Sequence, residues 1–120
     1  MQLKTPTQTF NSGIAKIYSV SNSSGSGNMP KKRLQLKIPN SLPYEEKTVG
    51  MSRFWAAMQE QTKIERLLRF PRLNEVERED IVIPIDGQQY RIKQIQYPPG
   101  IEPKCMDLSL EKVEVAYAVS

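Results

Sequence analysis

The chain of 120 residues has no histidine and a single cysteine, Cys105. One cysteine excludes an intramolecular disulfide, and without histidine both zinc binding and histidine-based catalysis lose their usual residue. No apolar run approaches the length of a membrane span, and the first residues lack the apolar core of a signal peptide. These absences predict a cytosolic protein without a disulfide framework or a membrane partner.

The sequence also lacks the motifs of the common catalytic sites. It has no glycine-rich phosphate loop and no serine in a nucleophile elbow. The densest carboxylate groups are Glu45 with Glu46 and the run at 75–80. They lie among basic residues in polar segments that we expect to be solvated. In such segments the pKa values of neighbouring carboxylates are not shifted apart, as acid–base catalysis requires. Cys105 is expected to be a partly buried, small apolar residue. We therefore expect no metal, no cofactor and no small-molecule substrate.

Apolar residues make up only 38% of the chain, and the mean hydropathy is −0.52. Such values predict long polar loops or tails around one small domain. We expect a flexible N-terminal arm over residues 1–12 and a single β-barrel domain over residues 13–117. The Ser/Gly-rich tract at 21–28 predicts a mobile loop over residues 21–33.

The clearest local signal is the Asp86-Gly87 pair between two apolar runs. This pair is typical of a two-residue type I′ hairpin. The turn would place Ile83 opposite Tyr90 and Ile81 opposite Ile92, so that Ile81, Ile83, Ile85, Tyr90 and Ile92 share one apolar face. The expected core comprises Trp55, Ile81, Ile83, Tyr90, Ile92, Leu108 and Leu110.

The remaining pattern predicts further short strands at 14–20, 34–38 and from residue 106 onward. A phase shift at 93–94 indicates a β-bulge. Residues 51–70 fit two structures: an amphipathic helix, or a hairpin that pairs 49–58 with 63–70. With turn clusters between the strands, the chain reads as an all-β protein, a small antiparallel barrel of about six strands.

The net charge of +4 is unevenly distributed. Residues 1–50 hold seven basic and two acidic residues, whereas residues 51–120 hold ten and eleven. Two basic groups are candidate interaction sites, and an acidic loop follows the second of them. Solvated surfaces with local ion pairs are the simpler explanation of all three groups. The residues concerned are Lys31, Lys32 and Arg33; Arg66, Arg69 and Arg72; and Glu75, Glu77 and Glu79.

From Gly13 onward the order of features resembles the bacteriophage head-tail joining, or head-closure, family. The features are Phe-Trp-Ala-Ala at 54–57, Arg-Phe-Pro at 69–71, Asp-Ile-Val-Ile at 80–83, Gly-Gln-Gln-Tyr-Arg-Ile at 87–92 and Leu-Ser-Leu-Glu-Lys-Val at 108–113. Together they span roughly residues 13–115. The resemblance implies a barrel of about six strands without enzymatic activity, and it favours the hairpin for residues 51–70.

The resemblance also implies a place in a virus particle. The protein would be made in the host cytoplasm and act at the head–tail interface of a tailed phage or prophage. A ring of copies, dodecameric in that family, would close the DNA-filled head, although the isolated chain is expected to be a monomer. Its partners would be the portal or adaptor protein above, tail proteins below and, non-specifically, DNA in the channel.

Two other interpretations remain open. A small nucleic-acid-binding barrel of the OB or SH3-like kind would need aromatic and basic side chains on one exposed sheet face. A tail-completion or tail-terminator protein of the same particle would share most of the features above.

Overall fold

The computed structural model describes residues 7–23, 31–50 and 63–119, and within these ranges all regular structure is β-strand. The predicted all-β class is confirmed. The strands are β1 (Gly13–Ser23), β2 (Lys31–Leu36), β3 (Leu42–Lys47), β4 (Arg66–Pro71), β5 (Ile81–Ile83), β6 (Tyr90–Gln96), β7 (Cys105–Lys112) and β8 (Ala118–Val119).

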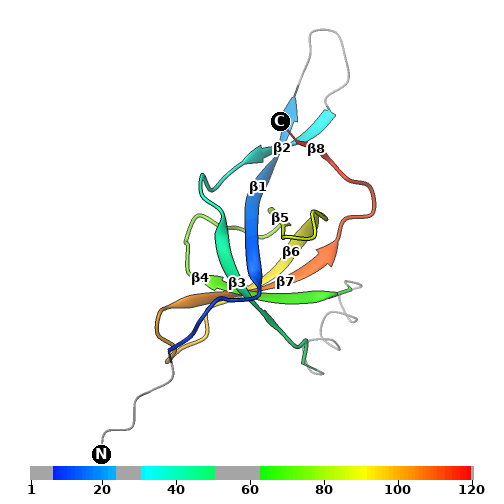
Figure 1. Cartoon of the computed structure of the whole chain (residues 1–120). Coiled ribbons are helices and arrows are strands. Elements are labelled where there is room, and N and C mark those ends of the chain that lie inside the picture. The colour runs from blue at the N-terminus through cyan, green and yellow to red at the C-terminus, as the bar shows by residue number, and fades with distance from the viewer. Residues whose placement is uncertain (1–6, 24–30, 51–62, 120) are drawn as a thin grey trace, which may run out of the picture.

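Six of these strands close into an antiparallel barrel in the order β1-β3-β4-β7-β6-β5, with β5 next to β1 again (Figure 1). β1 closes the barrel because its two edges have different partners. Residues 13–15 pair with β3 and residues 16–18 pair with β5. Closure removes the free edges that an open sheet would expose. The predicted six-stranded barrel is confirmed.

β1 is longer than the barrel requires. Residues 18–23 pair with β2, and β2 pairs with β8, so that a three-stranded extension projects beyond the barrel (Figure 1). The pairing of β2 with β8 is parallel. This pair lies outside the antiparallel barrel, because the chain after β7 runs back outside the barrel before it joins β2 (Figure 1).

The main core fills the barrel with inward side chains from all six strands. It includes Ile17 of β1, Tyr44 of β3 and Leu68 of β4, all almost fully buried. Val82, in β5, also belongs to it. Of the predicted core residues, Tyr90, Ile92, Leu108 and Leu110 lie in this core, Ile81 is buried in a second cluster, Ile83 is half-buried against that cluster, and Trp55 lies outside the described residues.

The β5–β6 hairpin forms, but its register differs by one residue from the prediction. Ile81 pairs with Arg91 and Val82 pairs with Tyr90, whereas the predicted turn placed Ile83 opposite Tyr90. A shift of one residue exchanges the two faces of a strand. Val82 therefore packs in the main core with Tyr90, and Ile81 and Ile83 belong to the second cluster. The predicted single apolar face is wrong.

The connection within this hairpin explains the shift. The Gly87 amide donates to the Pro84 carbonyl oxygen (3.0 Å), and the Gln88 amide donates to Asp86 Oδ1 (3.0 Å). Gly87 has a φ of 78°, but Asp86 does not have a positive φ, so a type I′ turn is excluded. Ile85 consequently lies at the tip with 73% of its surface exposed, outside the core.

Two other predictions concern β6 and β4. The register of β6 against β7 shifts between Ile92 and Gln94, which confirms the predicted bulge. The helix is wrong for the end of segment 51–70, because Arg66–Pro71 is a strand. The predicted hairpin of residues 49–58 with residues 63–70 is also wrong, because the neighbours of β4 on its two edges are β3 and β7. Residues 51–62 lie outside the described ranges.

The structure describes part of the predicted arm and part of the predicted loop. Residues 8–12 bond to the barrel: the Gln8 amide donates to the Glu102 carbonyl oxygen (2.9 Å), and the Ser12 amide donates to that of Tyr44 (2.9 Å). This part of the predicted arm therefore lies on the barrel. In the predicted loop 21–33, residues 21–23 pair with residues 31–33 as strands. Residues 1–6 and 24–30 lie outside the described ranges.

The Gly87 turn provides a first prediction. A Cβ at this position meets nothing within 4 Å, so the cost of Gly87→Ala is limited to the positive φ. We expect the free energy of unfolding to fall by about 1 kcal/mol, measured by urea denaturation. Gly50→Ala is the matched control, because its added Cβ also meets nothing and its φ is not left-handed. Equal losses in the two variants would contradict the turn described here.

Candidate functional site

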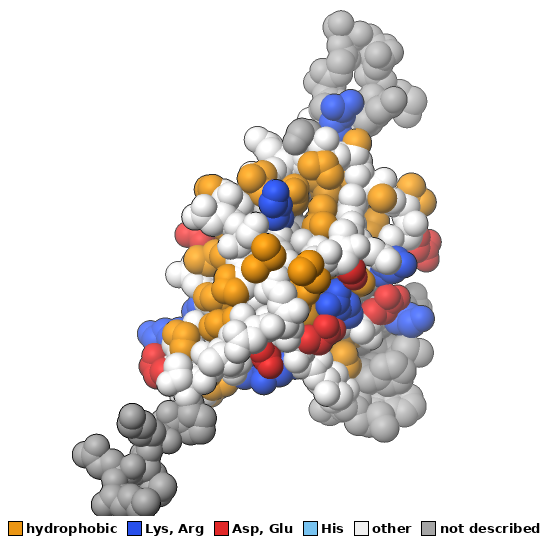
Figure 2. All heavy atoms as spheres, in the orientation of Figure 1, with side chains coloured by type: hydrophobic (Ala, Val, Ile, Leu, Met, Phe, Trp, Pro, Cys, Tyr) orange, Lys and Arg blue, Asp and Glu red, His pale blue; other side chains and the backbone are white. Residues whose placement is uncertain are grey.

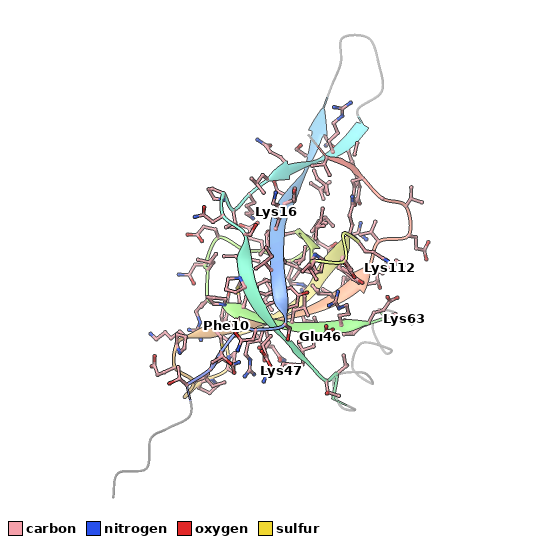
Figure 3. All side chains as sticks on the ribbon, viewed as in Figure 1. Phe10, Lys16, Glu46, Lys47, Lys63 and Lys112 are labelled. Carbon is pink, nitrogen blue, oxygen red and sulfur yellow. The ribbon has the colours of Figure 1, made fainter. Side chains whose placement is uncertain are left out.

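The first of the three predicted arginines closes one end of the barrel. Arg66 has the same phase on β4 as the core residue Leu68, and its guanidinium lies 5.2 Å from the centroid of the Tyr90 ring. It donates two hydrogen bonds to the Glu46 carboxylate, at 2.9 and 2.7 Å, and one to Asp86 at 3.2 Å. The bonds to Glu46, labelled in Figure 3, raise the pKa of Arg66. Its charge is neutralised within the chain.

The second arginine is paired just as closely. Arg69 donates two parallel hydrogen bonds to the Asp107 carboxylate, at 2.7 and 2.9 Å, and a third to Gln8 Oε1 at 2.9 Å. The exposed fraction of the side chain is 15% for Arg69 and 8% for Asp107. The hydrogen bonds to Asp107 raise the pKa of Arg69 against the opposing effect of burial. This pair joins β4 to β7 and anchors the N-terminal segment.

The third arginine lies at the start of β7. Arg72 donates through Nε to the Cys105 carbonyl oxygen (3.1 Å), and its guanidinium lies 4.8 Å from the centroid of the Tyr97 ring. Cys105 itself is fully buried, and burial raises the pKa of its thiol. A thiol with a raised pKa is a poor nucleophile at neutral pH. Cys105 therefore behaves as the small apolar residue that the sequence indicated.

The predicted acidic loop is largely neutralised by neighbouring basic side chains. Lys37 Nζ lies 2.8 Å from Asp80 and 3.7 Å from Glu77. Asp80 is buried and also accepts a hydrogen bond from the Glu77 amide (2.9 Å). Glu79 makes ion pairs with Arg91 (3.4 Å) and Lys93 (3.1 Å). The loop is therefore tied to the barrel, and its carboxylates do not form a free acidic surface.

One acidic residue of this loop differs from the others. Glu75 is exposed and has no ion-pair partner within the described ranges.

The predicted basic group at 31–33 is separate from the arginines of β4, because it lies on β2 in the projecting extension (Figure 1). Lys32 and Arg33 are exposed there. The structure therefore does not bring the predicted basic residues together into one surface.

An open groove lies between the end of β7 and the segment that follows it. Its charged lining is balanced, so it favours neither anions nor cations. Figure 3 labels two of its lysines, Lys63 and Lys112. The charged lining residues are Lys63, Arg91 and Lys112 on the basic side, and Glu65, Glu111 and Glu114 on the acidic side.

Among the residues that the structure describes, no cluster of three or more histidine, cysteine or acidic side chains is placed to hold a metal ion. In the same ranges, no helix is long and apolar enough to cross a membrane. The arrangement of side chains on the barrel therefore directs attention to its surfaces.

A second apolar layer, which was not among the predicted features, lies outside the barrel. Outward-facing Tyr18 of β1, Leu34 of β2 and Ile81 of β5 form a buried cluster with Val113. Val113 and Tyr117 belong to residues 113–119, which run outside the barrel from β7 to the end of β8; we call them the strap (Figure 1). The signal in the sequence was the apolar residues in both phases of β1 and β5.

The strap is held by hydrogen bonds from β6 and the residue before it. Gln89 makes two bonds to the backbone of Tyr117, donating to its carbonyl oxygen (2.9 Å) and accepting from its amide (2.8 Å). Arg91 donates to the Tyr117 hydroxyl (2.5 Å), and the Val113 amide donates to the Gln89 carbonyl oxygen (3.0 Å). These contacts hold the inward side chains of the strap on the second cluster.

The strap covers only part of this outer layer. Ile14 is 54% exposed, Leu36 45% and Ile85 73%. Figure 2 shows hydrophobic side chains gathered on this face of the molecule, and Figure 3 places Lys16 on it. We call Ile14, Lys16, Leu36, Ile83 and Ile85 the open apolar face. It is the best candidate for a binding surface on the described part of the chain.

No protein-family model matches the chain, and no curated protein sequence matches it.

Proposed function

We propose that the protein is a structural component of a tailed phage or prophage particle, in which a ring of copies below the portal closes the DNA-filled head and receives the tail. Two observations support the proposal. The order of sequence features resembles the head-closure family, and the fold is a closed six-stranded barrel of the kind that this resemblance implies.

The observation that carries the proposal is the double use of β1. Its first part closes the barrel between β3 and β5, and its outer part carries β2 and β8 beyond the barrel. A joint between two large assemblies needs a rigid body and elements that extend from it to its neighbours. One continuous strand connects these two parts, so a force on the extension reaches the barrel through an unbroken backbone.

The exposed charges suit contacts in a DNA channel. Lys32 and Arg33 lie on the projecting extension, where they are free to meet phosphate groups without sequence preference. The portal or adaptor protein would lie above the ring and the tail proteins below it. No step in this function requires a catalytic group.

The nucleic-acid-binding alternative has less support. Its binding face would need free arginines beside aromatic rings, but each arginine beside a tyrosine ring here also has another partner within the chain. Arg66 is paired with Glu46, Arg91 with Glu79, and Arg72 with a backbone carbonyl. A tail-completion protein would use the same geometry and must be separated by experiment.

The decisive experiment removes the gene from the phage or prophage that encodes it. We expect DNA-filled heads that lack tails and lose their DNA, measured by electron microscopy and by nuclease sensitivity of the packaged DNA. The wild-type chain supplied in trans should restore tailed particles. Closed heads with defective tails would point instead to tail completion, and normal particles would overturn the proposal.

A further inference from the structure

The open apolar face has an unusual arrangement of residues. Along β1, Lys16 lies between outward-facing Ile14 and Tyr18, and across the sheet it pairs with Ile83 of β5. Antiparallel sheets normally present polar side chains on a solvated face. Here a single exposed cation is set among apolar neighbours, and it has no ion-pair partner within the described ranges. Such a face fits an apolar segment that carries one carboxylate.

The strap presents a segment of this composition. Val113 and Tyr117 face the second cluster, whereas Val115 is 82% exposed and Val119 is 52% exposed. Glu114, next to Val115, is exposed and also lacks an ion-pair partner in the part of the chain that the structure describes. The outer side of the strap therefore carries apolar side chains beside an unpaired carboxylate.

We propose that the open apolar face binds the strap of a second copy of this chain, with Val115 packed beside Ile14 and Ile83 and with Glu114 paired with Lys16. The strap already covers one part of the outer layer in its own chain, so its apolar residues suit this layer. The open apolar face, which the chain's own strap leaves uncovered, packs against the outward side of a neighbouring strap. Charge complementarity between Glu114 and Lys16 selects the orientation.

A contact of this kind joins two different surfaces, so every copy has one donor and one acceptor. Head-to-tail contacts generate rings when the rotation closes. The inference deepens the proposed function and rests on it for the closure of a ring. A patch of a few side chains is too small for a stable pair, so the isolated chain remains mostly monomeric. Many weak contacts become effective once copies gather on a template.

The test is a zero-length carbodiimide cross-link, which joins a lysine amine directly to a carboxylate. In an equal mixture of isotope-labelled and unlabelled chains at about 1 mM, a contact with a dissociation constant of about 1 mM is occupied in roughly a third of the chains. We expect mass spectrometry to find Lys16 linked to Glu114 between labelled and unlabelled chains. The link should fall at least tenfold in Lys16→Glu, Glu114→Lys or Val115→Asp chains.

The charge swap separates a specific contact from general damage. A chain that carries both Lys16→Glu and Glu114→Lys should form the link again with the charges exchanged. Glu75→Lys is the matched control, because it reverses another unpaired, exposed carboxylate, and it should leave the link unchanged. Urea denaturation of each variant shows whether its stability is preserved.

Three results would overturn the inference: no link between differently labelled chains, a double reversal that fails to restore the link in a folded protein, or loss of the link in the Glu75→Lys control. The outcome is independent of the particle experiment. A link in solution together with normal particles after gene removal would support the contact between copies and reject the proposed function. Tailless particles without the link would support the proposed function and reject this contact.

Discussion

Replacing Arg69 with alanine is expected to lower the free energy of unfolding by about 3–5 kcal/mol, because it leaves the buried Asp107 carboxylate without its partner. The side chain of Asp107 is only 8% exposed, and both of its oxygens accept hydrogen bonds from Arg69. Urea denaturation followed by circular dichroism measures the loss. The effect should exceed that of any surface substitution on the barrel.

Two further variants are the controls for Arg69→Ala. Arg78→Ala removes an exposed arginine that has no ion pair within the described ranges, and it should change stability by less than about 0.5 kcal/mol. The double variant Arg69→Met with Asp107→Leu should cost less than Arg69→Ala alone, because no unpaired charge remains. A loss below about 1 kcal/mol for Arg69→Ala, typical of exposed pairs, would show that water screens this contact.

The same pair shows why the candidate sites were hard to predict. In the sequence, Arg66, Arg69 and Arg72 form one basic group and a candidate interaction site. The partner of Arg69 is 38 residues away in the sequence, and nothing near Arg69 indicates it. Several outward-facing positions on β4 and β7 are buried, so position on a strand did not reveal exposure. The alternation of residues along a strand indicates on which face of the sheet a side chain lies. Ion pairing depends instead on which strands become neighbours.

The central hairpin shows the same limit for the fold. Its existence followed from two apolar runs around Asp86-Gly87, and its strands are found where expected. The register could not be decided, because both phases of β5 are apolar and either could face the core. The hydrogen bonds of Pro84 and Asp86 settled it in favour of a longer connection. Only the second layer outside the barrel explains why a strand with two apolar faces is tolerated.

The open apolar face was more predictable than the charged candidates. Ile14, Lys16 and Tyr18 alternate with the core residues Ala15 and Ile17, so one strand carries apolar side chains on both sides. In a small domain, a strand of this kind must be covered on both faces or must expose apolar surface. The sequence could not indicate that the strap covers only part of the outer face.

The closure of the barrel depends on one close approach, which supports a last prediction. Gly13 pairs with Tyr44 at the point where β1 meets β3. A Cβ on Gly13 would lie 2.6 Å from Tyr44 Oη and 2.9 Å from its Cζ. The Tyr44 ring is 1% exposed and packs against Phe70 with 5.6 Å between ring centroids, so it cannot move aside without disturbing the core. Gly13→Ala should therefore lower the free energy of unfolding by about 1–3 kcal/mol.

A second-site variant tests the stated cause. Tyr44→Phe removes the oxygen that makes the closest contact, so Gly13→Ala should cost less in a Tyr44→Phe background than in the wild-type chain. Gly50→Ala, whose added Cβ meets nothing within 4 Å, should cost little in both backgrounds. An equal cost of Gly13→Ala in both backgrounds would show that the contact with the hydroxyl oxygen does not cause the loss.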